Sequence, residues 1–335
     1  MGLRIKYIGS KHTLMDRLVR LFAQHIPPGS VVADLFSGTG VVAARVHTQF
    51  GATVVTNDLQ LYAHVLSRAR VTRFSAADVR LIDAKVAEYN GLPGVEGFVA
   101  REFAPPRRKY FSAENARMID AARTRLEADR AALPERVYVY LLASVIAAAD
   151  RVSNVPTMYG AYLKGWLPRA LKPFRLDPYE PNGVTHGRNR ALQGDTLEVA
   201  ARVRADVAYL DPPYNSRQYC ASYHVLETIA RYDNPVAAGV TGRRDTSQQR
   251  SPFCSVPKAQ GAFELLVDRL RHVKTLLVSY SEDGIVPLDR MKQILGARGA
   301  RRVTMHSMTH KRLQTSDAAA NKTVMEVLFV ATQAA

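Results

Sequence analysis

The sequence is poor in several features that would define a class of protein. Its 335 residues include only two cysteines, Cys220 and Cys254, which excludes a disulfide-stapled scaffold and fits a reducing cytosol. No apolar run is long enough to cross a membrane. Acidic residues are scarce, with 30 Asp and Glu against 46 Lys and Arg, so the formal net charge is +16. That charge predicts a polyanionic partner, nucleic acid before an acidic membrane surface.

The sequence contains no motif for metal binding and none for binding a nucleoside triphosphate. The nine histidines show no ligand spacing with cysteines or acidic residues, so we predict no metal site. The Gly-x-x-x-x-Gly-Lys-Ser/Thr loop of nucleoside-triphosphate enzymes is missing as well. Apolar residues, in contrast, make up 47% of the chain, which excludes a disordered protein and suffices for one large or two modest domains.

The N-terminal part alternates strand and helix. The apolar run 31–36 predicts a buried strand, a Ser-Gly-Thr-Gly turn follows, a helix begins at Val41, and a second strand ends at Asp58. A strand, glycine turn, helix and strand in this order predict a parallel sheet and the α/β class. Further strands are predicted at 191–193, 206–210, 275–280, 302–306 and 324–330, the last two as an antiparallel hairpin at the sheet edge.

The middle of the chain interrupts this alternation. Helices are predicted at 117–130 and 137–149, and loops dominate 157–186. The region carries more Lys and Arg than Asp and Glu and is interpreted as an inserted, mainly helical subdomain. A second long polar stretch, 239–261, has no apolar periodicity and is predicted to be a loop.

Two motifs carry chemistry. In the first, Gly38 and Gly40 let a ligand approach the backbone, and Asp58 ends the next strand about 20 residues later, where a ribose diol would bind. This predicts an adenosine-containing ligand. The alternative of a nicotinamide-dependent oxidoreductase is weaker, because the third glycine of Gly-x-Gly-x-x-Gly is missing.

The second motif is Asp211-Pro212-Pro213-Tyr214, directly after an apolar strand. The prolines remove two backbone N–H donors, which leaves an acceptor-rich corner made by the Asp211 carboxylate and the Pro212 carbonyl. Such a corner suits an amino group with two donors, and Tyr214 offers a face on which a base can stack.

Together these residues resemble the S-adenosylmethionine-dependent DNA methyltransferases that modify exocyclic amino groups, in particular the DNA adenine methylase family. The resemblance implies a Rossmann-like sheet that is mostly parallel, a catalytic domain at 1–70 and 190–335, and a target-recognition domain at 71–189. It is carried by the segments 6–11, 34–40, 57–58, 194–195, 211–214 and 223–229.

The resemblance also implies residue roles. Tyr7 and Lys11 would contact the methionine end of S-adenosylmethionine, and Asp58 would accept its ribose hydroxyls. Asp195 would accept the adenine amino group of the cofactor. Asp211 and Pro212 would hold the target amine, and Tyr214 would stack on the target base. The remaining cofactor-binding residues are expected to be Asp34, Phe36, Gly38 and Gly40.

The expected reaction is direct methyl transfer to N6 of an adenine that is flipped out of duplex DNA. N4 of cytosine is the alternative target, and a non-catalytic DNA-binding subunit is the alternative from another class. A cognate restriction endonuclease is a possible partner, and the expected location is the cytoplasm, near the nucleoid. The basic residues expected to contact DNA are Arg107, Arg108, Lys164, Arg243, Arg244, Arg250, Lys311 and Arg312.

Overall fold

The computed structural model describes residues 3–9, 11–297, 301–311 and 323–333, and the chain forms two compact units. The helical unit consists of Met1–Ile8, Gln60–Asn182 and Tyr219–Gln249, and the sheet unit of Gly9–Leu59, Gly183–Gln218 and Arg250–Ala335. Among the described residues, no helix is both long and apolar enough to cross a bilayer.

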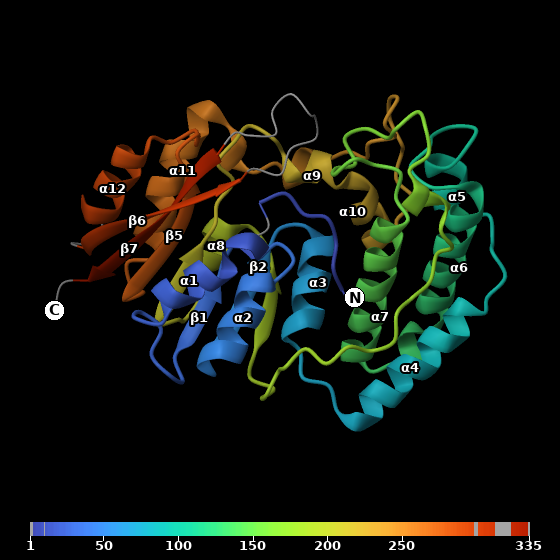
Figure 1. Cartoon of the computed structure of the whole chain (residues 1–335), viewed down its shortest axis with the longest axis horizontal. Helices are drawn as coiled ribbons and strands as arrows, with labels where there is room; N and C mark the ends of the chain where they lie inside the picture. The colour runs from blue at the N-terminus through green and yellow to red at the C-terminus, as the bar shows by residue number, and fades with distance from the viewer. Residues whose placement is uncertain (1–2, 10, 298–300, 312–322, 334–335) are drawn as a thin grey trace. The chain divides into compact units, whose positions relative to one another are not determined.

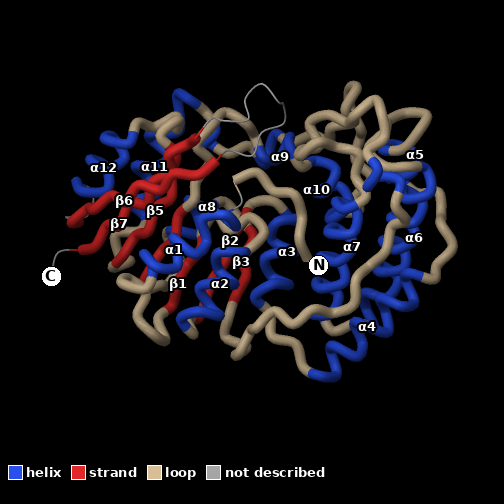
Figure 2. Tube along the Cα trace, in the orientation of Figure 1, coloured by secondary structure: helices blue, strands red, loops and turns tan. Residues whose placement is uncertain are grey.

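The sheet unit contains a seven-stranded sheet in the order β3-β2-β1-β4-β5-β7-β6 (Figure 2). The first five strands in this order are parallel, and β7 runs antiparallel to both β5 and β6. The α/β class and the antiparallel hairpin at the edge are therefore confirmed. The strands are β1 (Val31–Asp34), β2 (Thr53–Asp58), β3 (Arg190–Gln193), β4 (Val207–Leu210), β5 (Thr275–Ser281), β6 (Arg301–Lys311) and β7 (Thr323–Gln333).

Helices cover this sheet. Helix α2 packs on β1 and β2, whereas α12 packs on β6 and β7 (Figure 1). The prediction of a loop up to residue 261 is wrong at its end, because α11 begins at Val256 with Pro257 in its first turn. Its first buried side chains are small alanines, which give little apolar periodicity. The helices of this unit are η1 (Lys11–Leu14), α1 (Met15–Phe22), α2 (Val41–Phe50), α8 (Thr196–Ala200), α11 (Val256–Arg269) and α12 (Leu288–Ala297), with the short turn η5 (Pro252–Cys254) before α11.

The helical unit is built around α7 (Glu135–Arg151), which contacts α3, α4, α6 and α10. Residues 137–150 of α7 are all buried, as expected for a helix that is apolar on nearly every side. The predicted helices at 117–130 and 137–149 are confirmed by α6 and α7. The other helices are α3 (Leu61–Val71), α4 (Ala76–Asn90), α5 (Phe98–Phe103), α6 (Ala113–Asp129), α9 (Tyr219–Ser222) and α10 (His224–Arg231).

Glu227 explains why residues 219–249 fold with the helical unit. Its side chain is fully buried on α10 and accepts hydrogen bonds from the backbone N–H groups of Leu61 (3.2 Å) and Tyr62 (3.0 Å) at the start of α3. A carboxylate at this position satisfies two donors that the helix itself cannot. The compact units thus follow different boundaries from the division at residues 70 and 190, which stays a prediction about function.

Candidate active site

The sequence motifs lie at one edge of the sheet. Strands β1, β2 and β4 are parallel, so the residues at their carboxyl ends, Asp34, Asp58 and Asp211, lie along the same edge. The chain runs from β1 outward to β2 and β3, while β4 and β5 extend on the other side of β1. The strand order therefore reverses between β1 and β4, and ligands of open α/β sheets bind at such a point.

The turn after β1 has the backbone conformation that its glycines allow. Gly38 has a φ of 50° and Gly40 a φ of 76°, both in the left-handed region. Gly40 is also the N-cap residue, directly before the first residue of α2, and its N–H donates to the Ser37 carbonyl over 2.7 Å. The N–H of Gly38 donates to Asp58 Oδ2 over 3.0 Å. This hydrogen bond thus holds the glycine turn and the Asp58 carboxylate, which is expected to bind ribose, in a fixed position relative to each other.

Asn57 supports this arrangement, although the sequence alone predicts no role for it. Its side chain is fully buried, and its Nδ2 donates to the carbonyls of Gly194 (3.1 Å) and Leu35 (3.4 Å). It therefore connects the ends of β1, β2 and β3. Asp195 is exposed and caps α8, with Oδ1 accepting from the Leu197 N–H over 2.7 Å. This cap fixes the orientation of the Asp195 carboxylate.

Asp34 is a buried carboxyl group for which no side-chain hydrogen-bond partner is found among the described residues. Burial raises the pKa of Asp34 well above its usual value, and the nearby carboxylates of Asp211 and Asp58 raise it further. The backbone N–H groups of Ala43 and Phe36 interact with the carboxyl group and offset part of this rise in its pKa. An unpaired buried acid is costly, so this position suits a ligand that brings a cation or a donor.

Asp211 is held by an ion pair that the motif alone did not indicate. The Lys11 ammonium group, from η1, lies 2.9 Å from Asp211 Oδ1 and 3.2 Å from Oε2 of Glu326. Burial lowers the pKa of Lys11, but the carboxylates of Asp211 and Glu326 outweigh it, so the pKa is raised above its usual value. Burial raises the pKa of Asp211 to about 6, against the opposing effect of Lys11. Lys11, expected at the methionine end of the cofactor, thus contacts Asp211 directly.

The aromatic residues of the two motifs are partly buried on the same unit. The ring of Tyr214 meets Tyr280 edge-on, with centroids 6.3 Å apart, and its carbonyl accepts a hydrogen bond from Ile285. The ring of Phe36 meets Phe253 edge-on at 5.1 Å. These contacts fix both rings without covering them fully.

Tyr7 belongs to the helical unit. Its ring stacks on Tyr223 with centroids 5.3 Å apart and lies 5.7 Å from Tyr219. The hydroxyl group of Tyr223 accepts a hydrogen bond from the N–H of Ile8 over 2.7 Å. This aromatic cluster anchors the N-terminal segment in that unit, and the assignment of Tyr7 to the cofactor stays a prediction.

The basic residues expected to contact DNA differ in what surrounds them. Arg108 is buried, and its guanidinium group donates to the carbonyls of Gly239 (2.9 Å) and Val240 (3.1 Å). Arg244 is paired with Asp233. Both are thus engaged within the helical unit. Arg312 and the side chain of Lys311 lie outside the described residues, whereas Arg107, Lys164, Arg243 and Arg250 are described and exposed.

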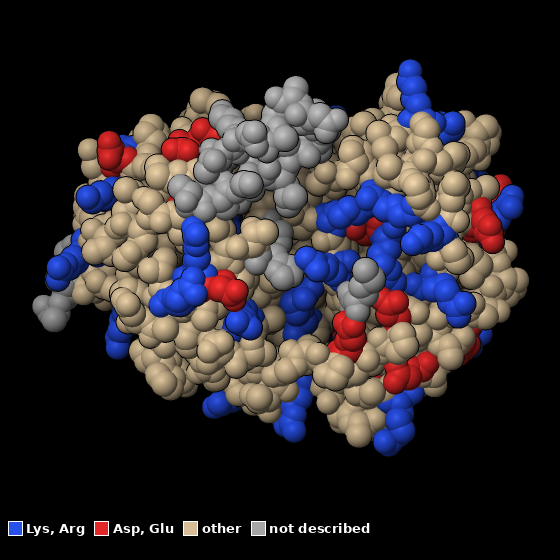
Figure 3. Space-filling model, in the orientation of Figure 1, with Lys and Arg blue, Asp and Glu red and all other residues tan. Residues whose placement is uncertain are grey.

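Figure 3 shows Lys and Arg side chains gathered on the visible face of the helical unit. Within that unit, Arg4 lies close enough to Arg70 to lower the pKa of the latter, after burial as the main cause. Lys6 has Asp150 and Arg169 as charged neighbours, and burial is the main reason that its pKa is lowered to about 8. The sequence alone did not single out Arg4, Lys6 or Arg70 as basic residues of interest.

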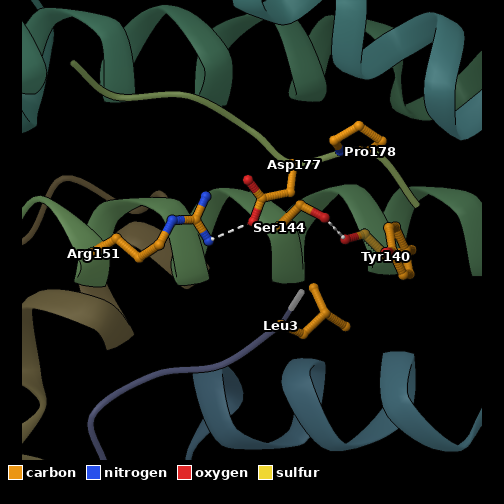
Figure 4. Close-up of a pocket in the computed structure, with 6 residues that line it drawn as sticks. All are labelled: Leu3, Tyr140, Ser144, Arg151, Asp177 and Pro178. Atoms are coloured by element: carbon orange, nitrogen blue, oxygen red, sulfur yellow. Dashed lines mark hydrogen bonds and ion pairs between the residues drawn. The ribbon is translucent and has the colours of Figure 1, made fainter. Parts of the chain in front are cut away.

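Two cavities lie away from these motifs. The first, in the helical unit, is lined by six residues and has a volume of about 10 Å³, which accommodates about one water molecule. Arg151 pairs there with Asp177 at 3.1 Å, and Ser144 donates to the Tyr140 carbonyl (Figure 4). The second, of about 350 Å³, lies beside the edge strand β3 and α8. Neither is lined by Asp211 or the glycine turn.

The chain combines a mostly parallel sheet with a glycine turn after β1, an acid at the end of β2 and an Asp-Pro-Pro-Tyr corner after β4. This combination is typical of enzymes that methylate amino groups of bases. The family model for the D12 class N6 adenine-specific DNA methyltransferase matches residues 7–287. The chain therefore belongs to this family, and its activity is methylation of adenine N6 in DNA. The predictions of the family, the enzyme class and adenine as the target are confirmed.

Curated relatives agree with this assignment. The chain is 33% identical over 300 residues to the type II methyltransferase M.NlaIII of Neisseria lactamica, covering 87% of each chain. It is 30% identical to the type II methyltransferase M.CviAII of Paramecium bursaria Chlorella virus 1, covering 97% of this chain and 98% of that one. It is 35% identical to the modification methylase LlaI of Lactococcus lactis subsp. lactis, of which it covers 48%.

Proposed function

We propose that the methyl donor is S-adenosylmethionine and that it binds at the carboxyl ends of β1 and β2. The observation that carries this proposal is Asp34, a buried carboxyl group that, among the described residues, only backbone N–H groups approach as donors, next to a turn with two glycines in the left-handed region. S-adenosylmethionine carries two cationic groups, an ammonium and a sulfonium, so the carboxylates along this edge suit it. When bound, it supplies a methyl group that is already activated for transfer.

The residues that hold the cofactor divide by chemistry. Asp58, fixed by the Gly38 N–H, accepts the ribose hydroxyls. The capped carboxylate of Asp195 accepts the adenine amino group. Because Gly38 and Gly40 carry no Cβ atom, the cofactor can approach the protein backbone closely at this turn. The ring of Phe36 covers one side of the cofactor. Because these groups are fixed before binding, little ordering remains to be done when the cofactor arrives.

Asp211 and Pro212 hold the target amine. One oxygen of Asp211 is bound to Lys11, and its other oxygen accepts one N–H of the adenine amino group, while the Pro212 carbonyl accepts the second. These hydrogen bonds localise the nitrogen lone pair, which is otherwise delocalised into the ring. Tyr214 stacks on the base. Alignment of the amine with the methyl group supplies much of the acceleration, and no covalent enzyme intermediate is needed.

The substrate is duplex DNA, from which the target adenine is flipped at a cost of a few kcal/mol. Exposed basic residues such as Arg107, Arg243 and Arg250 contact phosphates and give affinity without reading sequence. The names of the relatives, type II methyltransferase and modification methylase, support a role in protecting DNA from a cognate restriction endonuclease. We expect an enzyme with this function to act in the cytoplasm, on nucleoid DNA.

Calorimetric titration with S-adenosylmethionine tests the cofactor site. Asp58→Ala is expected to lower the affinity at least about tenfold, because it removes a fixed acceptor for two hydroxyl groups. Asp211→Ala is expected to bind within about twofold of the unchanged protein. Asp289→Ala, which changes an exposed acid on α12, is the matched control. Equal affinity for Asp58→Ala and the unchanged protein would refute the site.

A further inference from the structure

Glu326 is a buried acid close to the catalytic corner. It lies on β7, outside the segment that the family model matches, and no sequence motif includes it. Its side chain is 8% exposed, and its Oε2 lies 3.2 Å from the Lys11 ammonium nitrogen. The same nitrogen lies 2.9 Å from Asp211 Oδ1. One cation is therefore shared by two carboxylates, both within the sheet unit.

Strand pairing explains how a residue so late in the chain reaches this position. Because β7 is antiparallel to β5, Glu326 pairs with Ser281, the last residue of β5. The carboxyl end of β5 lies along the same edge as that of β4, after which Asp211 follows. A residue of β7 at this register is thereby delivered to the edge where the parallel strands end.

Lys11, Asp211 and Glu326 form a buried group with one positive and two negative side chains. Lys11 is 3% exposed in its side chain, and the groups that act on its charge are Asp211, Glu326 and Tyr214. Asp211 itself interacts with Lys11, Glu326, Asp34 and the hydroxyl of Tyr209. A single buried ammonium with a single carboxylate would form a neutral pair. With Glu326 present, the Lys11–Asp211–Glu326 group keeps a net negative charge.

We propose that Glu326 is a positioning residue for methyl transfer: it shares the Lys11 ammonium group, fixes its place, and leaves Asp211 free to accept the target amine. This proposal rests on the function assigned above to Asp211. Without Glu326, Lys11 would pair with Asp211 alone and draw the carboxylate charge away from the substrate. Its effect on the reaction passes through Lys11, and Glu326 itself touches neither the base nor the cofactor.

The charge of Glu326 affects how the rate of methyl transfer depends on pH. Burial raises the pKa of Asp211, Lys11 lowers it, and the negative charge of Glu326 raises it again, to about 6 in total. Removal of the Glu326 charge therefore lowers the pKa of Asp211. The acid side of the rate profile, which reports ionisation of Asp211, then moves to lower pH even though the maximal rate falls.

Glu326→Gln tests this with little change in shape. We expect kcat on unmodified DNA to fall at least about tenfold, since small misplacements at a reacting centre are costly. The acid limb of the kcat profile should move to lower pH, while KM for S-adenosylmethionine changes less than about twofold. Glu326→Asp should recover part of the rate. Glu282→Gln is the matched control, because Glu282 is exposed and accepts a hydrogen bond from the N–H of Met325, next to Glu326.

Two outcomes would overturn the proposal. One is an unchanged kcat and acid limb in Glu326→Gln, and the other is a fall in rate with an unmoved acid limb and no recovery in Glu326→Asp. Thermal unfolding of each variant shows whether it is folded, and if Glu326→Gln is not, Glu326→Asp decides by its own profile. If the unchanged protein transfers no methyl group from S-adenosylmethionine, the proposed function fails first, whatever Glu326 does.

Discussion

The N–H of Gly38 donates a hydrogen bond to Asp58 Oδ2 over 3.0 Å, which joins the turn after β1 to the last residue of β2. Two strands that are neighbours in the sheet thus share one ligand-facing corner. The bond depends on the left-handed conformation of the turn, with φ of 50° at Gly38 and 76° at Gly40. A substitution that alters the backbone of this turn is therefore expected to displace Asp58 as well.

Gly40→Ala is expected to weaken S-adenosylmethionine binding at least about tenfold, in addition to a stability cost of about 1–2 kcal/mol for placing Ala in the left-handed region. Gly29→Ala is the matched control, because Gly29 has the same φ of 76° and no atom within 4 Å of an added Cβ. It should show the stability cost alone. If S-adenosylmethionine binding is weakened equally in both variants, the glycine turn is not part of the cofactor site.

The rate of methyl transfer is expected to fall below about pH 6. Burial, opposed in part by Lys11, raises the pKa of Asp211 to about 6, and only the ionised carboxylate accepts the target amine. The rate should therefore drop toward tenfold per pH unit on the acid side and level off above pH 7. The profile of kcat, measured with saturating cofactor and DNA, checks this. A rate that is constant down to pH 5 would contradict the role of Asp211.

Asp34→Asn is expected to stabilise the fold at neutral pH and to weaken cofactor binding. Burial raises the pKa of Asp34, so the folded protein binds this proton more tightly than the unfolded chain. The stability tied to that proton is present at low pH and is lost as the pH rises through the folded pKa. The gain in melting temperature, about 2 °C or more at pH 7.5, should shrink toward pH 4. Lower stability of Asp34→Asn at pH 7.5 would show that Asp34 has a partner.

Arg243→Ala and Arg108→Ala should behave differently although both change an arginine of the helical unit. Arg243 is exposed, so its loss should reduce the slope of log affinity for DNA against log salt by about 0.9, with little effect on unfolding. Arg108 holds the carbonyls of Gly239 and Val240, so its loss should lower the melting temperature. Binding assays across salt concentrations, with thermal unfolding in parallel, would separate the two roles. The same change in salt slope and in melting temperature for both variants would contradict this division of roles.

Much of the fold follows from local sequence patterns. The strands β1 and β2 and the helix α7 are read correctly because each is a strongly apolar segment bounded by turn residues or charges. The hairpin of β6 and β7 follows from two strands without a helix between them. The start of α11 was missed, because its first turns carry small and polar residues that resemble a loop.

The candidate site divides in the same way. Asp58 and Asp211 end or follow strands and therefore carry a local signal. Glu326 gives none, since one acid within a strand is expected to face solvent, and only the pairing of β7 with β5 brings it to Lys11. Arg108 stands in a basic run that resembles a solvated surface, and its contacts with residues 239–240 are 131 and 132 positions away in the chain.

The most direct test follows the methyl group itself. The protein is incubated with S-adenosylmethionine labelled in the methyl group and with unmodified genomic duplex DNA, which is then digested to nucleosides. The account predicts label in N6-methyl-2′-deoxyadenosine for the unchanged protein, and none for Asp211→Ala despite retained cofactor binding. Label in N4-methylcytosine, or transfer by Asp211→Ala at the unchanged rate, would contradict it.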